Sequence, residues 1–105
     1  KLLKSATEQN FIATANALQV EYYEALQLFQ DAERRIKLYE NQSQLAQKTL
    51  DIMIKSFSAS GSGLSDILRI RQQMLDYETR KIEAIADFNT SIAWLKRLMA
   101  SSQIQ

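Results

Sequence analysis

Three carboxylates in the C-terminal half of the chain, Glu78, Glu83 and Asp87, are the residues whose types could support general acid–base chemistry. Such catalysis needs paired groups beside a substrate pocket, usually with a nucleophile or a histidine within reach. The sequence contains no His and no Cys, and the three carboxylates lie along an expected helix without an evident pocket. We therefore interpret them as ordinary helix-surface charges, and we predict no catalytic residue, no metal site, no cofactor and no enzyme activity.

Aromatic and basic residues are the other candidates for ligand binding. Trp94 and the neighbouring Tyr22 and Tyr23 could stack on a base or a sugar ring, but their helical spacing favours packing. The basic pair Arg34-Arg35 is too short for a nucleic-acid patch. The 13 Lys and Arg residues and 12 Asp and Glu residues leave a net charge of +1, spread along the chain. We expect neither nucleic acid nor an anionic membrane surface as a partner.

The composition indicates long helices. The 105 residues include only 2 Gly and no Pro, the two residue types that weaken or stop helices, and 46% of the chain is hydrophobic. No stretch approaches the roughly 20 apolar residues that span a bilayer. Because the sequence opens on Lys1 without Met, we expect it to be a piece of a longer protein.

A heptad pattern runs along the first half of the chain, from Phe11 to Phe57. Its members recur at alternating gaps of four and three and are apolar or aromatic apart from Ser43. This period is typical of helices that supercoil around a partner. We predict a helix over about residues 5–57, with Ser5 and Glu8 forming a capping box at its start. The seam facing the partner includes Tyr22, Phe29, Ile36, Tyr39, Ala46, Met53 and Phe57.

Residues 58–64 interrupt this pattern with both glycines and three serines, which tolerate left-handed turns and cap helices. A flexible linker is one interpretation; we favour a tight turn, because apolar seams run up to it on both sides. An exposed turn at the end of a rigid rod can carry recognition, although it can also be a mere connector. The candidate recognition residues are Ser58, Ala59, Ser60, Gly61, Ser62, Gly63 and Leu64.

The rest of the chain predicts a second helix over about residues 64–101, which carries two apolar seams. One holds Leu68, Leu75, Ile82, Ile85, Ile92 and Met99, and the other holds Ile67, Ile70, Met74, Tyr77, Phe88, Leu95 and Leu98. If the turn places Phe57 opposite Leu64, the residue numbers of facing partners sum to 121 and the first of these seams faces inward. Tyr39 would then lie opposite Ile82.

The fold predicted is all-α: a single antiparallel two-helix coiled-coil hairpin over residues 1–105, joined by the short Ser/Gly turn. The second seam would stay partly exposed, together with Leu38, Leu45 and Ile52 of the first helix. Exposed apolar stripes of this extent mark interfaces. We therefore expect the chain on its own to self-associate; light scattering that found a monomer at high concentration would contradict this.

The turn and the residues after it resemble TolC-like outer-membrane efflux proteins. The family pattern is an aromatic residue, then a glycine, then Asp-Val-Leu, and here Phe57 stands for the aromatic residue and Asp66-Ile67-Leu68 for the Asp-Val-Leu. Ser60 stands where the family usually has glycine, and Gly61 follows one place later. The resemblance is clearest over residues 57–99.

The resemblance implies a hairpin in the periplasmic helical barrel of a homotrimeric outer-membrane channel that exports small molecules. Its turn, residues 58–64, would lie at the periplasmic entrance and dock the adaptor protein that couples the channel to an inner-membrane pump. The alternative is a generic coiled-coil scaffold or interaction hairpin without a transport role. That alternative explains the heptads equally well and treats the turn pattern as coincidence.

Overall fold

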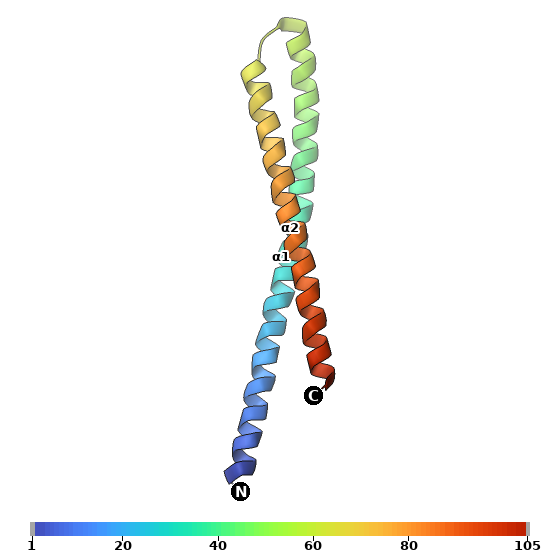
Figure 1. The fold of residues 1–105 in the computed structure, drawn as a ribbon. Coiled ribbons are helices and arrows are strands. Elements are labelled where there is room, and N and C mark those ends of the chain that lie inside the picture. Colours follow the sequence, from blue (N-terminus) through green and yellow to red (C-terminus); the bar gives the residue numbers. More distant parts are fainter. Residues whose placement is uncertain (1, 105) are drawn as a thin grey trace. The chain divides into compact units, whose positions relative to one another are not determined.

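The chain consists of two long helices, as seen in a computed structural model that describes the backbone of residues 2–104 and the side chains of residues 5–101. Helix α1 spans Leu2–Ser60 and helix α2 spans Leu64–Ile104. The two helices pack against each other across a short turn (Figure 1), which confirms the predicted all-α helical hairpin. Because α1 begins at Leu2, the predicted start at Ser5 was wrong, and Ser5 does not cap the helix.

Internal contacts divide the hairpin into two compact units. The first unit combines residues 1–31 with residues 87–105, and the second unit holds residues 32–86 with the turn. Each unit therefore contains one segment of α1 and one segment of α2, and each has its own apolar core.

The core of the second unit is a narrow seam between its two helical segments. Its buried members are Ala32, Ala46, Leu50, Ile67 and Ala84. The half-buried residues beside them include Ile36, Tyr39, Met53 and Phe57 from α1 and Ile70, Met74 and Tyr77 from α2. The ring centroids of Tyr39 and Tyr77 lie 6.5 Å apart with an interplanar angle of 24°, so two aromatic rings stack across this core.

The core of the first unit is built in the same way. Ala25, Ser91 and Leu98 are buried, and Phe29 packs on Phe88 with ring centroids 4.9 Å apart. The fully buried Ser91 hydroxyl donates a hydrogen bond to the carbonyl oxygen of Phe88 at 2.7 Å, which offsets the cost of burying it.

The predicted inward seam of the second helix was wrong. Exposed residues include Leu68, Leu75, Ile82, Ile85 and Met99, and Ile92 is half-buried. The other α2 seam, which was expected to stay partly exposed, lines the core instead: Ile67 and Leu98 are buried, and Ile70, Met74, Tyr77, Phe88 and Leu95 are half-buried.

On α1, the predicted seam lines the core from Ala25 to Phe57, but Phe11 and Tyr22 nearer its start are exposed. The Tyr22 ring stands edge-on to that of Tyr23, with centroids 6.0 Å apart, and Tyr can leave its polar end in water.

The two facing ring pairs define a register that differs from the predicted one. Their residue numbers sum to 117 for Phe29 and Phe88 and to 116 for Tyr39 and Tyr77, rather than to 121. The prediction assumed that α1 ends at Phe57, whereas α1 continues to Ser60 before the chain turns. A shift of four to five residues rotates the inward face of α2 from one seam to the other.

The charges explain why this register is the more stable one. The predicted inward seam of α2 also contains Arg71, Glu78 and Lys96, and burying a charged group is costly unless it is paired. The seam that packs inward contains Lys81 as its one charged member, and a lysine can lay its apolar stem on the core with its ammonium group in water. The register therefore keeps more charges at the surface.

Cysteine pairs can test this register directly. The double variant Tyr39→Cys/Tyr77→Cys should close an intramolecular disulfide on oxidation, because these positions face each other across the core. The variant Tyr39→Cys/Ile82→Cys should stay reduced within the monomer, since Ile82 is exposed on another face of α2. Gel mobility with and without reductant would reveal the bridge; closure of the second pair in place of the first would contradict the register.

Candidate functional site: the tip and the side surfaces

Two glycines shape the turn between the helices. The amide of Gly61 donates to the carbonyl oxygen of Phe57 at 2.6 Å, which completes the last turn of α1, and Gly61 then adopts a φ of +74°. Left-handed glycine at this position is the commonest way to end a helix. Gly63 has a φ of +96°, and its carbonyl oxygen accepts a hydrogen bond from the amide of Ile67 at 3.0 Å, which begins α2. The turn is thus defined by backbone geometry rather than by side-chain packing.

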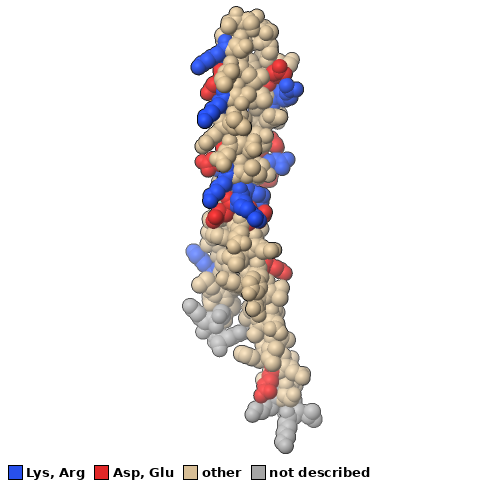
Figure 2. Space-filling model, turned by 180° about the vertical axis from the view of Figure 1, so that it is seen from behind, with Lys and Arg blue, Asp and Glu red and all other residues tan. Residues whose placement is uncertain are grey.

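Small side chains cover this turn. We call residues 58–64 the tip; all seven are exposed, and six of them are Ser, Ala or Gly. The Ser60 hydroxyl donates to the carbonyl oxygen of Ser56 at 2.9 Å and lies 3.0 Å from the Ser62 hydroxyl oxygen. No charged residue occurs between Lys55 and Asp66, and Figure 2 shows this end of the molecule without charged side chains. The tip therefore offers a neutral surface of small side chains and exposed backbone.

The residues after the tip stabilise the start of α2. The Asp66 carboxylate lies in the first turn of the helix, where a negative charge complements the helix dipole, and it accepts a hydrogen bond from Arg69 at 2.6 Å. Both side chains are largely exposed, so this ion pair contributes little to stability. Asp66 therefore favours the start of α2 at the end of the tip.

The backbone of Gly63 should be sensitive to substitution. A Cβ added there meets no atom within 4 Å, so the cost of Gly63→Ala comes only from the left-handed backbone. We expect Gly63→Ala to lower the free energy of unfolding by about 1–2 kcal/mol. Urea unfolding followed by circular dichroism measures this, with Ser62→Ala as the control that keeps the backbone unstrained. Equal stability of the two variants would show that the turn does not need the left-handed conformation.

Two rows of apolar residues remain exposed on the second unit. The α1 stripe consists of Leu38, Leu45 and Ile52, which are 49–68% exposed, as the sequence predicts. The α2 stripe consists of Leu64, Leu68, Leu75, Ile82 and Ile85, which are 39–67% exposed. Contiguous apolar surface of this kind marks an interaction site more often than scattered exposed residues do. The α2 stripe belongs to the seam that the sequence predicts to face inward, and it is exposed.

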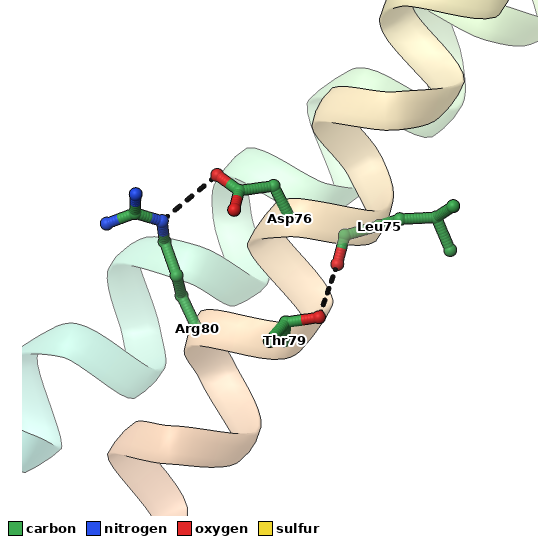
Figure 3. Close-up of polar contacts among 4 residues, drawn as sticks. All are labelled: Leu75, Asp76, Thr79 and Arg80. Carbon is green, nitrogen blue, oxygen red and sulfur yellow. Dashed lines mark hydrogen bonds and ion pairs between the residues drawn. The ribbon is translucent and has the colours of Figure 1, made fainter.

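An ion pair lies on the surface of α2 within the second unit. The Arg80 Nε donates to an Asp76 carboxylate oxygen at 3.0 Å on one side of α2 (Figure 3). Hydrogen bonding with the Tyr39 hydroxyl, followed by the interactions with Asp76, raises the pKa of Arg80. Both side chains of this ion pair are about half exposed, so it contributes little to stability. The i,i+4 spacing of Asp76 and Arg80 can be read from the sequence, whereas the proximity of Arg80 to Tyr39 depends on the register between the helices.

The residues that could have supported catalysis are not brought together. Glu78 and Glu83 are exposed on α2, and Asp87 is half-buried. Among residues 5–101, no group of three or more His, Cys, Asp or Glu side chains could hold a metal ion. Trp94 is half-buried, and its indole nitrogen is enclosed without a hydrogen-bond partner among the described residues. Within residues 5–101, the tip and the two stripes are exposed surfaces suited to binding another protein.

Neither helix is long and apolar enough to cross a membrane, as far as the described part of the chain extends.

No protein-family model, no curated protein and no solved structure matches the chain.

Proposed function

We propose that this hairpin is part of the wall of a TolC-like outer-membrane efflux channel in the periplasm. In this role α1 and α2 form a section of a tunnel for small molecules. The tip, residues 58–64, docks a periplasmic adaptor protein that connects the channel to an inner-membrane pump. The parent protein is a homotrimer, and the hairpin has no catalytic function.

The observation that carries this proposal is the exposed apolar surface on both helices. The hairpin buries one seam of each helix, yet the α1 stripe and the α2 stripe stay in water. A helix that is apolar on more than one side requires more than one neighbour. A closed wall of helices supplies such neighbours to α1 and to α2, whereas an isolated hairpin does not.

The position of the turn pattern also supports the proposal. The segment from Phe57 to Leu68 that resembles the family spans the end of α1, the turn and the start of α2. The one departure from the pattern is also accommodated: Ser60 ends α1 in helical conformation, and the next residue, Gly61, takes the left-handed one. A neutral tip of small residues suits close approach by another protein's backbone.

The reading frame on either side of these residues tests the proposal. An efflux channel predicts a secretory signal peptide, segments of alternating hydrophobicity that form membrane strands, and a second hairpin with a similar turn. Flanking sequence without these features would reject the channel role and leave a coiled-coil scaffold as the function of the hairpin.

A further inference from the structure

Helix α2 carries two mostly apolar rows in the second unit, and only one of them faces α1. We call the row that faces α1 the inner row; its members are Ile67, Ile70, Met74, Tyr77, Lys81 and Ala84. The α2 stripe belongs to the other row, and it lies one residue further along the helix: Leu68 follows Ile67, and Leu75 follows Met74. A rotation of α2 about its own axis by about 100°, with a shift of about 1.5 Å, therefore replaces the inner row by the α2 stripe.

Residues 64–86 of α2 offer no third apolar row. The remaining side of the helix carries Arg69, Gln73, Asp76, Arg80 and Glu83, all of them exposed and four of them charged. In Figure 3 the side chain of Leu75 points away from those of Asp76 and Arg80. The helix thus has a single alternative inward face, which it reaches by rotating in one direction only.

The facing row of α1 can pack on either row of α2. In the structure the register places Leu50 opposite Ile67 and Ser43 opposite Met74. Rotation by one residue would give the new pairs Leu50 with Leu68, Ser43 with Leu75, Ile36 with Ile82, and Ala32 with Ile85. It would also bring the charged residues Arg71 and Glu78 to the inner face, and burying charge is costly. The rotated arrangement is therefore packable but less stable.

The tip does not hold α2 in one rotational position. Only residues 61–63 connect α1 to α2, and a Cβ added to Gly61 or Gly63 meets no atom within 4 Å. All side chains of the tip are exposed, so none of them anchors the turn in a core. Glycine changes its backbone angles at little steric cost, and loop residues of this kind act as hinges. The packing between the helices alone selects the inner row.

We propose that α2 of the second unit is a two-state element, which alternates between the observed arrangement and one rotated by a single residue. The rotated state is the minor one, populated on the order of 1% or less. It exposes Met74 and Tyr77 in place of Leu75. A partner that packs on the α2 stripe holds the observed state, and a partner that packs on Met74 and Tyr77 favours the other, because a ligand shifts an equilibrium by its difference in affinity. This inference does not depend on the proposed function.

Disulfide closure between introduced cysteines measures the rotation, since the chain contains no cysteine of its own. Ser43→Cys/Leu75→Cys reports the rotated state, and Ser43→Cys/Asp76→Cys is its matched control. Leu75 and Asp76 lie about 130° to either side of the centre of the inner row, so both point similarly far from Ser43 in the observed state. We expect the Leu75 pair to close at least ten-fold faster than the Asp76 pair within the monomer. Quenched time courses on non-reducing gels give both rates.

Removing the charges that oppose the rotation should increase the rotated population. In the variant Arg71→Leu/Glu78→Leu, closure of the Leu75 pair should accelerate at least ten-fold relative to closure of Ser43→Cys/Met74→Cys, which reports the observed state. The control Arg69→Leu/Asp76→Leu makes the same kind of exchange on the side of α2 that is exposed in both states, and it should leave this ratio unchanged.

Circular dichroism establishes that all these variants remain helical. Equal closure rates for the Leu75 and Asp76 pairs in the otherwise unmodified chain would overturn the proposal. So would a Leu75 pair that does not accelerate in Arg71→Leu/Glu78→Leu.

Discussion

If the tip docks an adaptor as proposed, cells whose full-length parent protein carries Gly61→Arg together with Leu64→Glu should export no more drug than cells that lack the protein. Both positions are exposed at the tip, which contains no charged residue and no side chain larger than Ser before Leu64. Two bulky charges on this surface would have to lose water wherever an adaptor packs closely, and an unpaired charge in such an interface is costly. Intracellular drug accumulation and the minimum inhibitory concentration measure the loss.

The control variants keep the size and charge of the tip nearly unchanged. Gly61→Asn places a residue that tolerates positive φ, and Leu64→Met conserves volume, so both should retain export. Wild-type amounts of the charged variant in the membrane fraction would show that folding is intact. Undiminished export by the charged variant would favour the scaffold interpretation over adaptor docking.

Placing a charge at Ala84 should strongly destabilise the hairpin. Ala84 is 0% exposed, and the register places it opposite Ala32, which is also 0% exposed. Two small residues at this level leave little space between the helices, so Ala84→Glu must bury an unpaired carboxylate or separate the helices. We expect a loss of about 3 kcal/mol or more in the free energy of unfolding. Thermal melting by circular dichroism should show a decrease of at least about 10 °C.

Ala86 provides the matched control for this substitution. It lies two residues further along α2 and is exposed, so Ala86→Glu adds the same side chain to the same helix outside the core. Its melting temperature should stay close to that of the unmodified chain, because surface substitutions usually change stability by less than about 0.5 kcal/mol. Similar melting of the two variants would mean that the α2 seam containing Ala84 does not face α1.

The helices and the turn could be predicted because their signals are local. Heptad spacing and the absence of proline indicate two long helices, and the clustered glycines locate the turn. The inward face of α2 could not be obtained in this way, because both of its seams are apolar and heptad-spaced. Which of the two seams faces α1 depends on where α1 ends. The prediction assumed an end at Phe57, whereas α1 ends at Ser60, and this difference changes the seam that faces inward. The sequence did contain one signal against the predicted seam: it includes the charged residues Arg71, Glu78 and Lys96, which are costly to bury.

The candidate site shows the same division between local and long-range features. The left-handed glycines and the small residues of the tip follow from sequence, because turn geometry requires particular residue types. Which residues of α2 pack against α1, and which rows of apolar residues stay exposed, depend on contacts between residues distant in sequence. Such features require the register between the helices, so they became visible only in the structure.

Cross-linking from the tip in living cells tests adaptor docking most directly. A photoactivatable amino acid at Ser62 in the full-length protein should give, on irradiation, a covalent adduct with a periplasmic adaptor protein, identified by mass spectrometry. The same amino acid at Asn41, exposed on the body of α1, should give no adaptor adduct. The proposed function predicts an adaptor adduct at Ser62 alone; no adaptor adduct from Ser62 in cells that export drug through the protein would contradict it.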